Sequence, residues 1–384
     1  MLFEFATAGR ILFGDTSIRE IGPLAKAVGR KPLLLTGSRQ DRAAPVMSSL
    51  SAAGLVPQTY SVAAEPTFAT VTEAVEIARL SDCDCVIACG GGSVIDTGKA
   101  VAAIMTNGGT ALDYAELIGA GQTFERSSQP LFAVPTTAGA GAEATGHAMF
   151  VSPGHQLKVS LRSCHLLPRF SIVDPELSWS LPPVVTAATG FGALTHLIEA
   201  FLSRGGSPMT DVICRDGLRL AAAALPRAYE NGLDAEARRD MALAALFGGI
   251  ALANAGLGAA HGFATAIGGA FDAPHGSLCA RLLPEVLAIN LRAVTSRDSG
   301  NRRHSRFEEM ARILTGNPAA SAQEGILWIH DLRSRLEIRS LSAYGVTPAD
   351  FPVFIAKARA SGFMHGNAIE LTDEELIEIL SLSI

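Results

Sequence analysis

The sequence predicts a doubly wound, mostly parallel α/β domain over residues 1–180, followed by an all-helical domain over residues 181–384. Three observations support this division. Short apolar runs alternate with helical patterns through the first half of the chain, which is typical of a parallel sheet covered by helices. Strand-like alternation is scarce after Leu181, where long helical patterns dominate. Between the two regions, Asp174-Pro175 ends the last strand-like run, because the backbone before a proline avoids the helical region.

The first domain is expected to alternate strands with helices. Cys85–Cys89 is a continuous apolar run, which is typical of a strand buried on both faces of a parallel sheet. Glycines join this strand to a helical stretch through Ala100 to Met105. Further strands are expected at 3–13 (a strand or hairpin), 31–35, 56–61 and 130–134, and helices at 17–28, 43–53 and 70–80. Ligands of such sheets bind at the carboxyl ends of the strands, where these glycines fall.

The second domain is expected to be helical throughout. Helical spacing of apolar residues is found at 183–203, 209–228, 235–253, 258–270, 277–292, 307–314, 323–335, 348–360 and 372–381. The length of 384 residues is ample for two domains with separate cores.

Composition excludes several classes of protein. Hydrophobic residues make up 48% and charged residues 18%, which suits a compact globular enzyme and not a disordered chain. A net charge of −6 without a long basic cluster argues against binding nucleic acid. No run of about 18 apolar residues is present to span a membrane, and the start lacks a secretory signal pattern. Six cysteines are scattered along the chain, and Cys83, Cys85 and Cys89 fit small hydrophobic residues in and before a core strand. A reduced protein without structural disulfides, and so a cytoplasmic location, is expected.

The turn after the Cys85–Cys89 strand indicates a binding site. Three glycines and Ser93 separate the strand from a helix, so bare backbone N–H groups lie at the positive end of the helix dipole. Without a Cβ in the way, an anion can approach this backbone closely. The Walker and Rossmann motifs are excluded, because Ser93 and Ile95 stand where those patterns need glycine. We interpret the turn as a phosphate or pyrophosphate cradle, with an ordinary strand-to-helix turn as the alternative.

Two other strand ends support a dinucleotide site. The loop 135–145 is rich in glycine, alanine and threonine, so it can hydrogen-bond phosphate and ribose without steric conflict. The strand 33–36 ends in Gly37, Ser38 and Arg39, where dinucleotide folds place an acid that binds the ribose 2′-hydroxyl. Ser38 and Arg39 can instead bind a 2′-phosphate, which favours NADP over NAD. The alternative interpretation is that Arg39 is an exposed turn residue without a role in binding.

The helical domain contains three histidines in glycine-rich, apolar surroundings: His196, His261 and His275. Neutral imidazole is a good ligand for zinc and iron, so the three could converge on a metal. No pair of them has the i, i+4 spacing of an H-E-x-x-H helix. The alternative for each is a core or cap residue whose hydrogen bonds are satisfied.

Taken together, these segments resemble the iron-containing (group III) alcohol dehydrogenases, a superfamily that also includes glycerol dehydrogenases and maleylacetate reductases. The resemblance covers nearly the whole chain and is carried by residues 90–99 (GGGSVIDTGK), 135–145, 174–177, 188–200, 256–261, 274–276 and 371–375. It implies a dehydroquinate-synthase-like architecture with a dinucleotide-binding domain, a helical domain and an active site in the cleft between them. The implied reaction is hydride transfer between NAD(P)H and a carbonyl whose oxygen is polarised by a divalent metal.

The resemblance also implies roles for single residues. It assigns metal ligation to His196, His261 and His275, and it places His261 and His275 at the catalytic centre together with Thr265. The pyrophosphate would be held by Gly91, Gly92 and Ser93. The cofactor would be lined further by Asp96, Thr136, Thr137 and Lys158.

Four positions depart from the family pattern, and each change removes a polar group. Gly192 stands where the family has an aspartate ligand, four residues before His196 on the same helix face. Thr265 replaces a histidine that is suggested to assist proton transfer, and Ala140 and Ala142 replace hydroxyl residues. Without the aspartate the site is neutral, closer to the open three-histidine site of zinc hydrolases. We therefore expect the site for Fe²⁺ or Zn²⁺ to be weakened or lost.

Three functions are compatible with this sequence. The first is a cytoplasmic NAD(P)-dependent enzyme that interconverts a small alcohol and its aldehyde or ketone, with metal assistance if the three-histidine site is occupied. The second is a metal-independent enzyme, similar to maleylacetate reductases, that acts on a keto or enol acid and uses the histidines to bind a carboxylate or donate protons. The third is a nucleotide-binding paralogue that has lost catalysis. The resemblance implies a homodimer.

Overall fold

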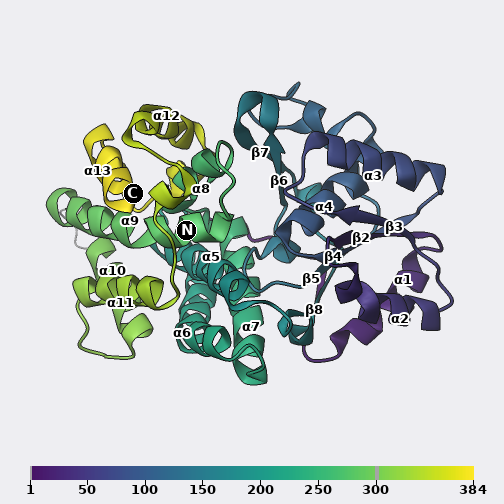
Figure 1. Cartoon of the computed structure of the whole chain (residues 1–384), viewed down its shortest axis with the longest axis horizontal. Helices are drawn as coiled ribbons and strands as arrows, with labels where there is room; N and C mark the ends of the chain where they lie inside the picture. Colours follow the sequence, from purple (N-terminus) through teal and green to yellow (C-terminus); the bar gives the residue numbers. More distant parts are fainter. Residues whose placement is uncertain (1, 299–301) are drawn as a thin grey trace. The chain divides into compact units, whose positions relative to one another are not determined.

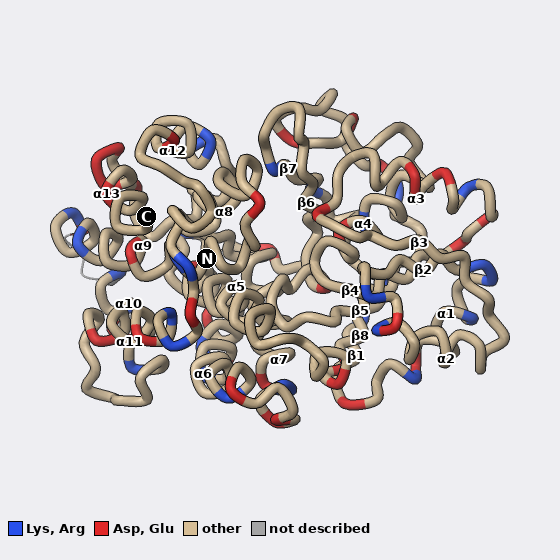
Figure 2. The backbone as a smooth tube through the Cα atoms, viewed as in Figure 1, with Lys and Arg blue, Asp and Glu red and all other residues tan. Residues whose placement is uncertain are grey.

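The computed structural model describes residues 2–298 and 302–384. The chain divides into two compact units (Figure 1). The sheet unit spans residues 6–180, and the helical unit spans residues 181–384 together with the start of the chain. Lys and Arg are interspersed with Asp and Glu along the tube of both units (Figure 2).

The sheet unit is built around a six-stranded sheet in which every neighbouring pair is parallel. Its strands lie in the order β1-β8-β5-β4-β2-β3. Their bounds are β1 (Arg10–Phe13), β2 (Pro32–Gly37), β3 (Gln58–Val62), β4 (Cys85–Gly90), β5 (Leu131–Pro135) and β8 (Phe170–Val173). The helices between them are α1 (Ile21–Val28), α2 (Ala44–Ala52), α3 (Phe68–Leu80) and α4 (Gly92–Asn107). The order is not sequential, so the predicted doubly wound topology is confirmed.

The central strand β4 is buried on both faces. Val86 and Ala88 join a core cluster with side chains of α3 and α4. Ile87 and Cys89 point to the opposite face and join a second cluster with side chains of α1 and α2. Successive residues of a strand point to opposite faces, so a continuous apolar run is what a strand between two helical layers requires.

Two details of the sheet unit differ from the expectation. The strand expected at 3–13 is formed only at its end, as β1 (Arg10–Phe13). An antiparallel pair, β6 (His147–Ser152) and β7 (Leu157–Arg162), was not predicted. Side chains of β6 alternate between partly exposed and buried, which is the pattern of a half-buried strand. The pair packs its buried side onto the core cluster that contains α3 and α4.

The helical unit consists of nine α-helices with short 3₁₀ turns among the residues described. They are α5 (Pro183–Leu202), α6 (Pro208–Glu230), α7 (Ala235–Ala255), α8 (Ala259–Gly268), α9 (His275–Arg297), α10 (Arg302–Thr315), α11 (Ala322–Arg335), α12 (Phe351–Ala360) and α13 (Asp373–Ser383). The expected helices correspond to these elements. The one difference that matters for the site is that α9 begins at His275, two residues before the expected start.

The helix α5 forms the centre of the helical unit. By length and composition α5 could cross a membrane, with a mean hydropathy of 1.3, so the expectation of no such run is wrong by that measure. The bent pair α7 and α8 also meets this length and composition criterion if the two helices are counted as one span. However, 83% of the α5 window is buried inside the structure, which is the burial of a core helix.

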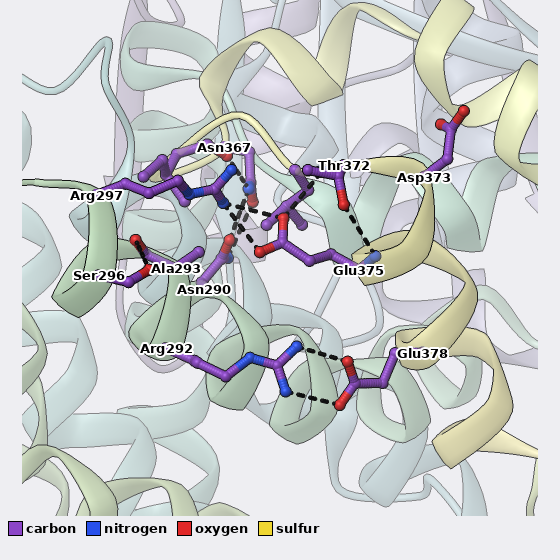
Figure 3. Close-up of polar contacts among 12 residues, drawn as sticks. Asn290, Arg292, Ala293, Ser296, Arg297, Asn367, Thr372, Asp373, Glu375 and Glu378 are labelled. Carbon is purple, nitrogen blue, oxygen red and sulfur yellow. Dashed lines mark hydrogen bonds and ion pairs between the residues drawn. The ribbon is translucent and has the colours of Figure 1, made fainter.

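The last helix, α13, is fastened to α9 by two ion pairs (Figure 3). Arg292 pairs with Glu378 at 2.5 Å, and Arg297 pairs with Glu375 at 2.9 Å. Thr372 and Glu375 form a capping box that begins α13. The segment that resembles the family's tail is therefore a helix start held against α9.

Candidate active site

The glycine turn joins β4 directly to α4. Gly90 is the last residue of β4, and α4 begins at Gly92 with Gly91 as its N-cap. No side chain among the described residues caps this helix end. A Cβ added to Gly91 would meet nothing closer than Thr137, at 3.6 Å. The fold itself therefore does not require glycine at position 91, and the open backbone N–H groups suit an anion.

The threonine loop lies beside this turn. The strands β4 and β5 are neighbours, with Gly90 opposite Pro135, and the Thr136 N–H donates to the Gly90 carbonyl at 2.9 Å. A Cβ at Gly92 would lie 2.9 Å from the Cβ of Ala140, so the two loops are in close contact. Both predicted phosphate loops thus lie at the carboxyl edge of the sheet, as open α/β sheets place their ligands.

The predicted cofactor residue Asp96 belongs to a buried charge network. The Lys99 ammonium donates to the Thr145 hydroxyl at 2.8 Å and to the His147 carbonyl at 2.6 Å, and it lies 3.4 Å from Asp96. Asp96 also accepts the Met149 N–H at 3.0 Å. Burial raises the pKa of Asp96 and lowers that of Lys99, while their pairing opposes both shifts. This network ties α4 to β6, and contact of Asp96 with a cofactor stays a prediction.

A third buried ionisable group lies in the same unit. Glu143, in the loop after β5, is 3% exposed. Burial raises its pKa to about 7, although its own backbone and Lys99 pull in the opposite direction. Glu143 is therefore largely protonated below neutral pH.

Two other predicted cofactor residues are engaged in ion pairs. Lys158, on β7, pairs with Glu65 at 2.7 Å. Arg39 donates from Nε and from an Nη to the two carboxylate oxygens of Asp41, at 2.9 and 2.7 Å. Gly37 ends β2, and Ser38 follows it. Asp41 was not among the predicted site residues, and it places an acid next to the arginine expected to bind a 2′-phosphate.

The structure brings the three predicted histidines together. His196 lies on α5, His261 on α8, and His275 is the first residue of α9. The rings of His196 and His261 are stacked with centroids 4.6 Å apart, and those of His261 and His275 are 5.4 Å apart. We call these three residues the histidine cluster.

Glu199 fixes the orientation of His261. Its Oε2 lies 2.7 Å from Nδ1 of His261, and its Oε1 accepts the Ala260 N–H at 2.7 Å. Both side chains are almost fully buried, at 4% and 2% exposure. Within the described part of the chain, Nε2 of His261 has no hydrogen-bond partner. A carboxylate that holds one imidazole nitrogen and leaves the other available is the usual support of a metal-binding histidine.

Two glycines let the helices approach closely enough to form this cluster. A Cβ at Gly258 would lie 2.8 Å from a Glu199 carboxylate oxygen, so α8 can begin there only without a side chain. A Cβ at Gly276 would collide with the Ala188 carbonyl oxygen of α5. The start of α9, with His275, is therefore packed directly on the α5 backbone.

A second polar side chain anchors the start of α8. Asn367 accepts the Ala259 N–H at 3.1 Å. Its amide also exchanges hydrogen bonds with Asn290 of α9, at 3.1 and 2.8 Å (Figure 3). The helix that carries His261 is thus held at its first turn by Glu199 and Asn367.

Two of the four departures from the family pattern, Gly192 and Thr265, lie in the helical unit and have different surroundings. Gly192 is buried in α5, and a Cβ there would meet only the Gly276 Cα, at 3.7 Å. Thr265 lies one turn after His261 on α8, with its hydroxyl oxygen buried and without a hydrogen-bond partner in the residues described. A buried hydroxyl in that state is expected to bind a ligand atom or water.

The structure adds one residue, Cys279, to which the sequence pattern assigned no role. Cys279 lies one turn after His275 on α9, and its Sγ is 3.6 Å from Nε2 of His275. The ligand atoms of His261, His275 and Cys279 all lie within 4.8 Å of one another. The signal was present in the sequence, because His275 and Cys279 have the i, i+4 spacing that places two side chains on one helix face. It was missed because the helix was expected to start after His275.

The donor set fits a divalent cation. It contains imidazole nitrogens and a thiol, with an available nitrogen on His261 that a buried carboxylate orients. Such a cation in a buried site can stabilise negative charge on an oxygen. The sheet unit contains the predicted phosphate loops, and the helical unit contains the histidine cluster.

Comparison with known proteins covers both units. Residues 8–175 match the family described as iron-containing alcohol dehydrogenase, and residues 186–384 match the C-terminal domain of the Fe-containing alcohol dehydrogenase family. The 1,3-propanediol dehydrogenase of Citrobacter freundii is 32% identical over 391 residues, covering 98% of each chain. The NAD-dependent methanol dehydrogenase of Bacillus methanolicus is 30% identical over 384 residues, covering 96% of each.

Solved structures agree with these relatives. A 1,3-propanediol oxidoreductase superposes with a TM-score of 0.93 at 30% identity, over 100% of both chains. The sulfoacetaldehyde reductase of Bifidobacterium kashiwanohense, solved in complex with NAD⁺, superposes with a TM-score of 0.88 at 27% identity, over 100% of this chain and 99% of that one.

Proposed function

Because the chain belongs to the iron-containing alcohol dehydrogenase family, we propose that it interconverts a small alcohol and its aldehyde with a nicotinamide cofactor and a divalent cation. That it is an oxidoreductase of the alcohol dehydrogenase type follows from the family and from relatives that act on alcohols and diols. The proposal adds the cofactor, the cation and the residues that hold them.

The observation that carries the proposal is the buried pair of Glu199 and His261. With Nδ1 held by a carboxylate, Nε2 of His261 can bind a cation by giving up its proton, and it makes no geometric hydrogen bond to another described residue. His196 and His275 lie against the same ring. When bound, the nicotinamide supplies the hydride and the cation polarises the carbonyl oxygen.

Residues of the chain would orient the cluster, hydrogen-bond the substrate and bind the cofactor. Glu199 keeps His261 in one tautomer and one orientation. Thr265, with its buried hydroxyl one turn along α8, would donate a hydrogen bond to the substrate oxygen as negative charge develops there. Gly91 and Gly92 would present backbone N–H groups to the pyrophosphate.

Cofactor choice depends on Arg39 and Asp41. We propose that both NAD(H) and NADP(H) are accepted, with NADP(H) preferred. The support is that the Arg39–Asp41 pair is exposed, and exposed ion pairs are weak enough for a 2′-phosphate to compete for the guanidinium. The bound NAD⁺ of the sulfoacetaldehyde reductase fits the same family of cofactors.

The other two functions are not favoured. The relatives reported above carry names of alcohol, diol and aldehyde enzymes, whereas a metal-independent enzyme of keto acids would have no need of a carboxylate-oriented histidine. A paralogue without catalysis would not require both an intact cradle in the sheet unit and such a cluster in the helical unit. We also propose the cytoplasmic homodimer that the family resemblance implies, which light scattering of the purified protein tests for oligomeric state.

The test is cofactor consumption with a panel of short aldehydes, hydroxyaldehydes and keto acids. We expect NADPH and NADH oxidation with aldehydes, lost on treatment with chelator and restored by Fe²⁺ or Zn²⁺. His261→Ala should lower kcat/KM at least about 100-fold, because it removes a ligand of the cation that would polarise the reacting oxygen. His304→Ala is the matched control, since His304 lies on α10 and pairs with Glu308. Turnover of keto acids alone, unaffected by chelator, would overturn the proposal.

A further inference from the structure

We propose that Cys279 supplies the anionic ligand that Gly192 lacks, so that His261, His275 and Cys279 form a cation site that selects Zn²⁺ over Fe²⁺. The inference rests on the proposed function, because it specifies the ligands of the same cation. It concerns a residue that the family pattern does not use in this way.

The distances fit coordination. The three ligand atoms lie within 4.8 Å of one another, and Sγ of Cys279 is 3.6 Å from Nε2 of His275. Zinc–sulfur and zinc–nitrogen bonds of about 2.3 and 2.05 Å at a tetrahedral angle separate sulfur from nitrogen by about 3.6 Å. The His275–Cys279 pair already has that spacing. The pair spans one turn of α9, so a short helical segment holds both ligands.

Burial and hydrogen bonding argue for a ligand site and against a chance contact. Cys279 is fully buried, and His261 is 2% exposed. Nε2 of His261 lacks a partner within the described residues, while its other nitrogen is held by Glu199. A buried donor or acceptor that is left unpaired destabilises a fold, so a bound cation would remove a penalty that the fold otherwise carries.

Charge supports the same assignment. The aspartate of the family pattern would give the site one negative charge, and Gly192 removes it. When Cys279 binds the cation, its S–H proton passes to solvent and the thiolate sulfur donates an electron pair to the metal, with no change of oxidation state. The thiolate restores the missing negative charge. It is also a softer ligand than a carboxylate, and soft ligands favour zinc over ferrous iron at such sites.

The position of His196 is consistent with an open coordination position. His196 stacks on the face of His261, and it is not one of the three residues whose ligand atoms lie within 4.8 Å of one another. Three protein ligands and one open position are the arrangement of catalytic zinc sites, where the open position takes water or substrate. The family's first histidine ligand would here line the position where the substrate oxygen binds.

The test uses cobalt as a spectroscopic probe of sulfur ligation. Chelator-treated protein is titrated anaerobically with Co²⁺ alone, and the near-ultraviolet thiolate-to-cobalt charge-transfer band is recorded. We expect one equivalent to bind with this band in the wild type and in Cys214→Ala. Cys214 is a buried cysteine of α6 and so is a matched control. Cys279→Ser should lack the band and bind Co²⁺ at least about 10-fold more weakly, a loss at least as large as removing a supporting residue causes.

Further measurements keep the test decisive. If Cys279→Ser does not fold, X-ray absorption of the zinc-loaded wild type should show a sulfur neighbour at about 2.3 Å. Protein offered equal Fe²⁺ and Zn²⁺ should retain zinc by mass spectrometry. Binding of one Co²⁺ without the charge-transfer band, unchanged in Cys279→Ser, would overturn the inference and leave the proposed function standing. Failure to bind Co²⁺ or Zn²⁺ at all would overturn both.

Discussion

Replacing Glu199 by Gln tests whether this carboxylate and His261 form a buried ion pair. In the metal-free protein, burial lowers the pKa of His261, but the neighbouring Cys279 sulfur and the Glu199 carboxylate outweigh burial and raise it to about 10. The imidazole of His261 is therefore protonated at neutral pH, 2.7 Å from the Glu199 carboxylate. Removing one charge of a buried pair costs roughly 3–5 kcal/mol. Gln can still accept one backbone N–H, so we expect Glu199→Gln to lower the free energy of unfolding by about 3 kcal/mol at pH 6.

The cost should depend on pH in one direction. The pKa of His261 is about 10 in the fold and about 6.5 in an unfolded chain. A raised pKa of this kind contributes stability that is complete below the unfolded value and is lost as the pH rises through the folded one. Towards pH 10 the difference between wild type and Glu199→Gln should therefore fall to about 1 kcal/mol, the contribution of a neutral hydrogen bond.

Urea unfolding of chelator-treated protein, followed by tryptophan fluorescence, measures this difference. Trp328 lies in the helical unit and Trp179 in the sheet unit, so a Trp179→Phe background reports on the helical unit alone. Glu285→Gln is the matched control, because Glu285 is a buried carboxylate of the same unit paired with Arg333, which stays charged throughout. Its other neighbour, His330 at 3.7 Å, has a pKa that burial lowers, so it adds little charge over this range. The control's loss should not decline between pH 6 and pH 10. An equal loss at both pH values in Glu199→Gln would refute the ionised pair.

Three other changes test separate parts of the structure. Glu143→Gln should stabilise the sheet unit at pH 8 by up to about 3 kcal/mol more than it does at pH 4, because the pKa of Glu143 is about 7 and the wild type loses stability as the pH rises to that value. A difference between variant and wild type in urea unfolding that does not change with pH would contradict this. Asp41→Asn should raise the ratio of kcat/KM for NADPH to that for NADH several-fold, since it releases the Arg39 guanidinium, and an unchanged ratio would count against Arg39. Gly276→Ala should lower the melting temperature by about 5 °C, because its Cβ meets backbone. At Gly192 an added Cβ meets no close neighbour, so Gly192→Ala should be neutral or stabilising by up to about 1 kcal/mol. Equal melting temperatures for Gly276→Ala and Gly192→Ala would refute the close packing of Gly276 on α5.

Much of the fold could be predicted because local patterns and tertiary packing agree. The run at Cys85–Cys89 is apolar at every position, and β4 is buried on both faces. The β6–β7 pair escaped prediction because it follows a long loop of small residues, and each of its strands is only six residues long. At the amino end, the alternation of apolar and polar residues over 3–13 is longer than the strand, because β8 forms hydrogen bonds only with Arg10–Phe13.

The site was predicted only as far as single residues could indicate it. The sequence indicated three histidines as potential metal ligands, His196, His261 and His275. The structure brings their rings together. One contribution depends on a three-dimensional contact that no local pattern contains, because Glu199 and His261 are 62 positions apart. The ion pair of Arg39 with Asp41 joins residues only two positions apart, so it was visible in the sequence and was overlooked.

The double anchoring of α8 by Glu199 and Asn367 determines how the site behaves when it is empty. Small zinc domains lose their shape when the metal leaves, because the metal is what folds them. Here the first turn of α8 is fixed by side chains of α5 and of the carboxyl-terminal segment, independently of any cation. The ring of His261 therefore has the same position in the apoprotein, so the entropy cost of ordering it is part of folding and does not reduce the affinity for a metal. Repeated cycles of stripping and reloading should leave the protein folded, with the exchange rate set by breaking ligand bonds and not by opening the helical unit.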